Sequence, residues 1–240
     1  MKFINYYSPN FNKVKRSNKS IKLIVIHYTG MQSERESLLR LTNKKTKVSS
    51  HFLITNTGKI YRLVSDNLIA WHAGKSCWGS LKNLNKYSIG IELVNKGHKF
   101  GYTNFKQKQI LSLKKVCKKL IKKYKIKKKN IVGHSDIAPT RKIDPGEKFP
   151  WKKLASDKIG IWHSCDLNLL KKFRKVKVSK KNKKIFIKYL SNIGYCISSK
   201  KRSYLIKAVK AFQRHYRNSL INGLLDKECL LIAQNLSQKL

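Results

Sequence analysis

The chain has 240 residues, of which 55 are Lys or Arg and 11 are Asp or Glu, giving a formal net charge of +44. Its hydrophobic content of 41% and aromatic content of 10% are typical of a globular protein and exclude a disordered chain. No stretch reaches the roughly 18–20 apolar residues that a membrane-spanning helix needs. The length suffices for one substantial core and a smaller second module.

The excess of basic residues allows two interpretations. It suits a polyanionic partner such as nucleic acid, anionic lipid or an acidic wall polymer. The lysines are, however, spread along the whole chain and accompany many Asn and Ile residues, a pattern that AT-biased compositional drift alone produces. No block interleaves basic and aromatic residues, so no specific nucleic-acid partner is expected.

Cysteine usage and the N-terminus bear on redox state and compartment. The five cysteines form no CxxC pair and are odd in number, which argues against a disulfide framework. The opening residues, MKFINYYSPNFNKVKRSNKS, lack the apolar centre of a secretion signal, so no export route is visible. The missing signal points toward the cytoplasm.

The first half of the chain alternates predicted strands and helices. IKLIVIHYT (21–29) and SIGIELVN (88–95) are apolar and rich in β-branched residues, as buried strands are. HFLITNTGKIYRLV (51–64) predicts two strands around a turn. Ser33 followed by Glu36 matches a capping box, so a helix is expected directly after Ser33.

The second half contains a long amphipathic helix and a polar loop. Apolar residues recur at helical spacing over 106–124, with lysines on the other side. IVGH (131–134) is a short strand that leads into HSDIAPTRKIDPG (134–146), whose prolines and polar residues predict a loop. Asp226 is expected to cap the last of three further helical patterns. These patterns cover residues 184–191, 203–216 and 226–238.

The patterns predict an α/β (α+β) fold, with a mixed central β-sheet flanked by helices and a small three-helix C-terminal domain. The segment KKFRKVKVSKKNKK (171–184) has little to bury and places the connection between the two domains. The expected division is an N-terminal arm (1–20), a main domain (21–165), a basic linker (166–183) and a helical domain (184–240).

Two histidines and one aspartate have the positions of metal ligands. His27 and His134 each end an apolar strand, and Asp144 follows in the loop. A single histidine at a strand end is more often structural. Two histidines and a carboxylate suit one zinc ion with an open fourth position, as a hydrolase requires. Closed structural zinc sites prefer four ligands that include cysteine, and no cysteine has such spacing here.

Two further charged residues stand out. Glu92 interrupts an otherwise apolar strand, where an unpaired buried carboxylate would be costly. It is either paired with one of the many lysines or acts as a general base beside metal-activated water. Lys142 lies between the two candidate ligands of the loop, where its charge could stabilise a tetrahedral intermediate. Lysine is so common in this chain that Lys142 is a candidate only because it lies between the two proposed ligands of the loop.

Four segments occur in an order that resembles the type 2 zinc-dependent N-acetylmuramoyl-L-alanine amidases. They are IVIHYT, AWHAGKSCWG, SIGIELVN and HSDIAPTRKIDPG, followed by FPWKKLA. The resemblance covers most of the main domain. It implies a mixed sheet with helices packed on it and one zinc ion in a surface groove. It also implies hydrolysis of the amide between the lactyl group of N-acetylmuramic acid and L-alanine of the peptidoglycan stem peptide.

Carried over to this sequence, the family's motifs place the zinc ligands on His27, His134 and Asp144. They place the catalytic glutamate on Glu92 and the oxyanion-stabilising lysine on Lys142. None of the five positions departs from the family's pattern, and all five are those that the residues themselves had indicated.

Four more residues are expected to border the substrate, namely Tyr28, Trp71, His72 and Arg141. For His72, shaping the loop is an equal alternative to touching substrate. Trp71 faces either substrate or the core. Arg141 pairs either with a stem-peptide carboxylate or with an acidic group of its own loop. Asp136, which lies between the loop's two ligands, is expected to stabilise the loop.

The C-terminal segment, with AVKAFQ and GLLD, resembles a three-helix peptidoglycan-binding module. The two-domain arrangement is similar to the AmiD-type branch of the family, which acts on wall polymer in the periplasm, whereas the cytoplasmic recycling branch usually lacks the second module. We therefore expect a monomer that acts on peptidoglycan or muropeptides at the cell envelope, near an anionic surface. The missing signal leaves the cytoplasm as the alternative.

Two other functions are also compatible with the sequence. A non-catalytic peptidoglycan-recognition protein could use the same fold, but such relatives typically lose a metal ligand, and all three are present here. A nucleic-acid binder would rest on the net charge alone.

Overall fold

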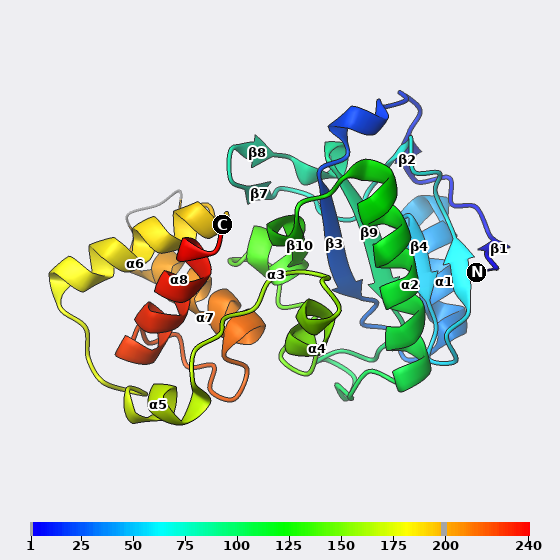
Figure 1. Cartoon of the computed structure of the whole chain (residues 1–240). Coiled ribbons are helices and arrows are strands. Elements are labelled where there is room, and N and C mark those ends of the chain that lie inside the picture. The colour runs from blue at the N-terminus through cyan, green and yellow to red at the C-terminus, as the bar shows by residue number, and fades with distance from the viewer. Residues whose placement is uncertain (1, 198–200) are drawn as a thin grey trace.

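A six-stranded mixed β-sheet forms the centre of the main domain in the computed structural model, which describes residues 2–197 and 201–240. Its strands are Ile4–Asn5 (β1), Leu23–Tyr28 (β3), Phe52–Ile54 (β4), Ile60–Arg62 (β5), Ser88–Leu93 (β9) and Ile131–Gly133 (β10). The strand order is β1-β5-β4-β9-β3-β10 (Figure 1). Strands β4, β9, β3 and β10 run parallel, whereas β5 runs antiparallel to β4. The predicted mixed sheet is confirmed.

Helix α2 (Gln107–Tyr124) covers one face of this sheet (Figure 1). Its apolar side packs through residues such as Leu113 against Ile24 of β3 and Ile91 of β9. The helix predicted from the apolar spacing is therefore present, and most of the lysines on its other side are exposed to solvent.

Helix α1 (Glu34–Thr42) lies on the opposite face of the sheet (Figure 1). It begins after Ser33, whose hydroxyl oxygen accepts a hydrogen bond from the backbone N–H of Glu36, as the capping box predicts. Leu41 of this helix packs with Leu53 of β4. Both faces of the sheet are therefore covered near its centre.

The N-terminal residues, expected to form a polar arm, pair with strands of the main domain. Strand β1 pairs in parallel with β5 at one edge, and β2 (Phe11–Asn12) pairs with β6 (Ile69–Ala70). The guanidinium of Arg16 donates hydrogen bonds to the carbonyl oxygens of Asp66 and Ser88, at 2.9 and 2.8 Å. Strands of two residues are too short to show alternation in a sequence, so this pairing gave no local signal.

Short elements connect the larger ones. Strands β7 (Cys77–Trp78) and β8 (Leu81–Lys82) form a small hairpin, and helices α3 (His134–Ile137) and α4 (Trp151–Ser156) follow β10. Turns of 3-10 helix occur at Asn18–Ser20, Lys44–Thr46, Leu84–Lys86 and Lys128–Asn130.

The C-terminal residues fold as a small helical domain. Its three predicted helices are present as Lys180–Ile193 (α6), Arg202–Tyr216 (α7) and Lys227–Gln238 (α8). Asp226 caps α8 as expected, because its Oδ1 accepts from the backbone N–H of Cys229 at 2.9 Å. The segment expected to be a linker contains a further helix, α5 (Leu167–Lys172), whose Leu170 is buried in the domain's core.

The helical domain packs directly on the main domain. In Figure 1, α7 lies beside α3 and α4 at one end of the sheet, and the N-terminal edge strand lies at the other end. One apolar cluster contains Leu23 and Val132 of the sheet together with Phe186 and Phe212 of the helical domain. The two domains therefore share a core, which limits their independent movement.

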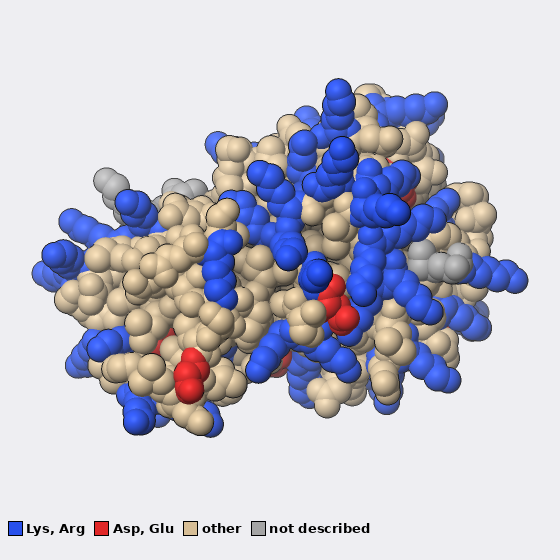
Figure 2. Space-filling view, in the orientation of Figure 1, with Lys and Arg blue, Asp and Glu red and all other residues tan. Residues whose placement is uncertain are grey.

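Basic side chains lie over both domains on the face that Figure 2 shows, with few acidic ones between them. Among the described residues, no helix is both long and apolar enough to cross a lipid bilayer.

Candidate metal centre and active site

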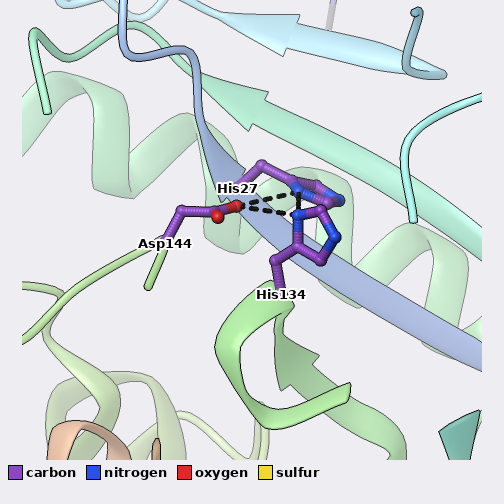
Figure 3. A group of neighbouring side chains, drawn as sticks. All are labelled: His27, His134 and Asp144. Carbon is purple, nitrogen blue, oxygen red and sulfur yellow. Dashed lines mark hydrogen bonds and ion pairs between the residues drawn. The ribbon is translucent and has the colours of Figure 1, made fainter. Parts of the chain in front are cut away.

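Three polar side chains converge where β3 and β10 end (Figure 3). Nδ1 of His27 lies 3.0 Å from Nδ1 of His134 and 3.0 Å from Oδ2 of Asp144. Nδ1 of His134 lies 3.2 Å from the same Oδ2. All three residues are buried. The structure thus brings together the three residues that the sequence indicated as metal ligands.

Each of these side chains is placed by the end of a regular element. His27 lies near the end of β3, and His134 is the first residue of α3, directly after β10. Asp144 is tied to α3 because its carbonyl oxygen accepts from the backbone N–H of Ser135 at 2.8 Å. The segment predicted to be loop throughout therefore begins with one helical turn, which is too short to show a helical period.

The proton of His134 is on the side away from the cluster. Its Nε2 lies 3.1 Å from the carbonyl oxygen of Ala73. A carbonyl oxygen only accepts, so Nε2 carries a proton and donates this bond. The neutral ring with its proton at Nε2 has its lone pair on Nδ1, the atom that faces the cluster.

A chain of hydrogen bonds places the proton of His27 in the same way. The hydroxyl of Ser88 donates to the carbonyl oxygen of Leu84 at 2.6 Å, so its oxygen accepts from Nε2 of His72 at 3.2 Å. Burial lowers the pKa of His72 well below its usual value, so this ring is neutral and its Nδ1 is an acceptor. That Nδ1 accepts from Nε2 of His27 at 3.1 Å, which leaves Nδ1 of His27 unprotonated.

Two ring nitrogens and one carboxylate oxygen therefore face one another, and each offers a lone pair when both rings are neutral. Burial, followed by the neighbouring His134, lowers the pKa of His27 to about 4, so the ring is neutral near pH 7. Burial alone would raise the pKa of Asp144, but the two histidines outweigh it and hold that pKa well below its usual range. Two imidazole nitrogens and one carboxylate oxygen at these separations can hold a metal ion.

His72 lies behind His27 and packs on a glycine. A Cβ atom at Gly90 of β9 would stand 2.4 Å from Cγ of His72, so only glycine leaves room for this ring. The backbone N–H of Gly90 in turn donates to Nδ1 of His51 at 3.0 Å. Both ring nitrogens of His72 bond to protein atoms. This arrangement is consistent with a role in shaping the site, and because His72 also lines the pocket, its predicted contact with substrate stays a prediction.

Glu92 lies beside the cluster on the neighbouring strand. The register of β3 and β9 pairs it with His27. Its Oε2 is buried without a hydrogen-bond partner among the described residues, where Glu92 also forms no ion pair with a lysine. Burial, followed by the negative charge of Asp144, raises the pKa of Glu92 to about 8. An unpaired carboxyl group with a raised pKa next to a metal-type cluster is a candidate for proton transfer.

All nine expected site residues line one pocket of about 280 Å³. They are His27, Tyr28, Trp71, His72, Glu92, His134, Arg141, Lys142 and Asp144. Arg141 donates to the carbonyl oxygens of Ala73 and Lys75, at 3.1 and 2.5 Å, and so supports a neighbouring loop. Among the described residues it forms no ion pair with an acidic side chain. Nε1 of Trp71 donates to Oδ1 of Asn12 at 2.5 Å, which holds the indole at the pocket and out of the core.

Sequence reasoning missed the contribution of α1 to the pocket. Arg40 and Ser37 of this helix line the pocket together with Thr29. Arg40 is exposed, and its charge lowers the pKa of Glu92. An arginine at an exposed helical position has no distinguishing pattern in a sequence this basic, so no local signal could have identified it.

The fold and this pocket are those of a hydrolase with a candidate metal site. Residues 17–147 match the family described as N-acetylmuramoyl-L-alanine amidase. The chain therefore belongs to the N-acetylmuramoyl-L-alanine amidases, enzymes that hydrolyse the amide between N-acetylmuramic acid and L-alanine of peptidoglycan. The family expected from the sequence motifs is confirmed.

Individual relatives agree with this assignment. The N-acetylmuramoyl-L-alanine amidase AmiD of Escherichia coli is 36% identical, over 91% of this chain and 83% of that protein. The 1,6-anhydro-N-acetylmuramyl-L-alanine amidase AmpD of Haemophilus influenzae is 35% identical over 62% of this chain and 88% of that protein. The structure of E. coli AmiD with a substrate matches with a TM-score of 0.81 at 35% identity, covering 95% of this chain and 93% of that one. AmpDh3 of Pseudomonas aeruginosa matches with a TM-score of 0.82 at 31% identity, over 100% of this chain and 99% of that one.

Proposed function

We propose that this protein hydrolyses the bond between N-acetylmuramic acid and L-alanine with one zinc ion per chain, held by His27, His134 and Asp144. The observation that carries the proposal is the convergence of two imidazole nitrogens and one carboxylate oxygen, which face one another at 3.0–3.2 Å. Neutral imidazole and carboxylate are ligands that zinc prefers. Three protein ligands leave a fourth position open, as catalytic zinc sites require.

The distances fit the size of zinc. Zinc bonds of ~2.0–2.1 Å in tetrahedral geometry place neighbouring ligand atoms roughly 3.3 Å apart. The three observed separations of 3.0, 3.0 and 3.2 Å lie close to that value. When bound, zinc supplies Lewis acidity and lowers the pKa of water to about 7. The hydrogen bonds from Nε2 of His27 to His72 and from Nε2 of His134 to Ala73 orient the two rings for this task.

Glu92 is the proton carrier in the proposed reaction. Its Oε2 has no competing partner among the described residues, so it is free to take a proton from the attacking water. The same carboxyl group then gives a proton to the nitrogen of the leaving L-alanine. Burial and Asp144 raise the pKa of Glu92 to about 8, and Lys142 and Arg40 lower it only in part. The positive charge of a bound zinc ion would lower that pKa further and so favour the ionised form that a base needs.

Lys142 is the proposed partner of the developing oxyanion. It lines the pocket two residues before Asp144, and its charge also disfavours protonation of His27. An ammonium group at this place would stabilise negative charge on the lactyl carbonyl oxygen. We propose that Tyr28, Trp71 and Arg141 border the bound substrate, since all three line the same pocket.

The proposed substrates are peptidoglycan fragments. The E. coli AmiD structure contains anhydro-N-acetylmuramic acid-L-Ala-D-γ-Glu-L-Lys, and a P. aeruginosa AmpDh3 structure contains an anhydromuramic pentapeptide. The second of these covers 96% of this chain at a TM-score of 0.82, so its helical domain has a counterpart here. We propose that the helical domain binds peptidoglycan and that the enzyme acts as a monomer at the cell envelope, near its anionic surface.

One experiment tests the function and the choice of substrate together. Purified protein with zinc is incubated side by side with intact sacculi and with soluble anhydromuropeptides, and the products are identified by mass. We expect stem peptides that begin with L-alanine. Preferred use of sacculi would support action at the envelope, whereas exclusive use of small fragments would support the cytoplasmic alternative. No release from either substrate would contradict the proposal.

A non-catalytic recognition protein is the second candidate. It would retain the pocket and bind wall fragments without turnover. The complete set of three ligands and the unpaired Glu92 argue against it, because simple recognition needs neither. Zinc analysis distinguishes the two functions, since we expect about one zinc ion per chain in the enzyme.

A further inference from the structure

We propose that the helical domain holds ligands of the metal centre in place. Its residues His215 and Tyr195 position the helical turn α3, which presents His134. Both residues act through Asp136 and are positioning residues. The inference rests on the proposed zinc-dependent function. It adds a structural task for the helical domain that is separate from any binding of peptidoglycan.

Asp136 connects the ligand loop to the helical domain. One carboxylate oxygen, Oδ2, accepts from the backbone N–H of Gly133 at 2.7 Å and from Nδ1 of His215 at 2.7 Å. The other, Oδ1, accepts from the hydroxyl of Tyr195 at 2.6 Å. Asp136, His215 and Tyr195 are each 2% exposed, so these bonds are shielded from water. Gly133 directly precedes His134, and Asp136 follows it by two residues.

The orientation of the His215 ring is fixed by its neighbours. It stacks between Trp151, with ring centroids 3.8 Å apart, and Tyr216, at 4.0 Å. Its Nε2 has no hydrogen-bond partner in the part of the chain that the structure describes. The bond to Asp136 is therefore the polar contact that gives this buried imidazole its orientation. A buried histidine held this way loses much of its stabilisation if the carboxylate moves.

Tyr195 is also fixed in place by close packing. Its ring packs edge-on against Trp78, with centroids 5.0 Å apart. A Cβ atom at Gly194 would stand 2.3 Å from the indole of Trp78, so the backbone before Tyr195 fits closely against the main domain. The backbone N–H of Gly79 donates to the carbonyl oxygen of Gly194 at 2.7 Å. The hydroxyl of Tyr195 thus reaches Asp136 from a fixed place.

Helix α7 and the turn that follows it contact the segment around Asp144 at two further places. Nζ of Lys207 donates to the carbonyl oxygen of Thr140 at 3.5 Å, and Nδ2 of Asn218 donates to that of Glu147 at 2.9 Å. The segment between these contacts carries Lys142 and Asp144. The helical domain therefore contacts the chain on both sides of the ligand Asp144.

The position of α3 matters for both loop ligands at once. His134 is its first residue, and the N–H of Ser135 holds the carbonyl oxygen of Asp144 at 2.8 Å. A shift of this turn would move Nδ1 of His134 and Oδ2 of Asp144 relative to His27, which belongs to the rigid sheet. Zinc binding depends on ligand atoms held in a narrow geometry, so loosening the turn weakens the binding of the metal.

Tyr195→Phe tests the inference because it removes only one hydroxyl group. Its matched control is Tyr204→Phe, which removes a hydroxyl that bonds to the carbonyl oxygen of Cys196 within the helical domain and does not touch the loop. His215→Phe keeps an aromatic ring in the stack but loses the donor to Asp136. His215→Asn keeps an N–H donor at the position of Nδ1 and serves as the rescue.

The zinc dissociation constant is measured by competition with a chelator, beside kcat, KM and the melting temperature of each full-length variant. We expect Tyr195→Phe and His215→Phe to bind zinc roughly tenfold more weakly, as removal of outer-shell support does. We expect kcat to fall at subsaturating zinc with KM unchanged, His215→Asn to regain most of the affinity, and Tyr204→Phe to match the wild type.

Two results would overturn the inference. One is wild-type zinc affinity in both Tyr195→Phe and His215→Phe. The other is a loss of affinity that follows the melting temperature in all variants, including Tyr204→Phe, which would reduce the role to general stability. Either result leaves the proposed function standing. Wild-type protein that binds no zinc would instead overturn the proposed function, and this inference with it.

Discussion

His27 and Glu92 lie side by side at the same level of two neighbouring parallel strands, β3 and β9. Residues paired in this way point to the same face of the sheet, so the imidazole and the carboxylate face one pocket. Neither side chain depends on a mobile loop for its place. The sheet itself therefore sets the separation between a metal ligand and the proposed proton carrier.

This pairing predicts the effect of Glu92→Gln. The amide keeps the size of the side chain but cannot take a proton, so we expect kcat to fall by about 100-fold or more. Zinc content should stay at the wild-type level, because Glu92 is not one of the clustered ligand residues. Muropeptide hydrolysis and elemental analysis check the two parts. Glu36→Gln, on the exposed side of α1, is the matched control and should keep full activity. Full activity in Glu92→Gln would show that another group carries the proton.

Zinc should also stabilise the fold. A ligand that binds only the folded state at 100 times its dissociation constant adds about 2.7 kcal/mol to the free energy of unfolding. We therefore expect a chelator to lower the melting temperature and added zinc to restore it. His134→Ala should remove this response, since it deletes one of three ligands, whereas His98→Ala, at an exposed histidine, should retain it. A zinc response that survives in His134→Ala would place the metal elsewhere.

Most residues of the candidate site could be predicted from the sequence because they interrupt strong local patterns. Glu92 interrupts an apolar strand, and His27 lies near the end of another. A buried polar side chain needs a polar or metal partner, so these positions alone indicate a site. Strand β9 and helix α2 are long enough to show their periods, and both were predicted at nearly their observed bounds.

The features that sequence analysis missed depend on contacts between distant residues. Asp136 and His215 are separated by 79 positions, and no local pattern links them. Arg16 was expected in a polar arm, but its guanidinium bonds to Asp66, 50 residues away. The hydrogen bonds of the two ring nitrogens of His72 join residues that no local pattern links. Contacts between residues so far apart form only in the folded chain and leave no local pattern in the sequence.

Lys142 offers a separate test of oxyanion stabilisation. Removing a group that stabilises a developing oxyanion costs about 100- to 1,000-fold in kcat, so Lys142→Ala should lose activity on that scale. Zinc binding should persist, because all three ligands remain. The hydrolysis rate at saturating substrate is the measurement. Lys153→Ala, at an exposed lysine of α4, is the control. An effect confined to KM would show that Lys142 binds the ground state and the transition state equally.

His72→Phe distinguishes the two tasks considered for His72. The phenyl ring fills the space but cannot accept from Nε2 of His27, which leaves a buried donor unpaired. We expect zinc affinity to fall by about 10- to 100-fold, as loss of an outer-shell partner does. With enough zinc to saturate the site, KM should be close to the wild-type value. A raised KM with unchanged zinc affinity would instead show that His72 contacts the substrate.

Buried neutral histidines make the fold sensitive to acid. Burial, followed by the charge of Arg16, lowers the pKa of His51 from 6.5 to about 3. Between these two values the unfolded chain binds a proton that the folded chain does not, so the free energy of unfolding decreases as the pH falls. The slope from this one group reaches about 1.4 kcal/mol per pH unit.

His51→Asn should reduce this slope. Its amide oxygen can replace Nδ1 as the acceptor for the N–H of Gly90, and an amide does not titrate in this range. Urea unfolding at a series of pH values between the two pKa values measures the slope directly. The comparison uses slopes because the substitution can also change stability at neutral pH, where His51 is uncharged in both states. An unchanged slope in His51→Asn would mean that His51 takes up its proton in the folded protein as readily as in the unfolded chain.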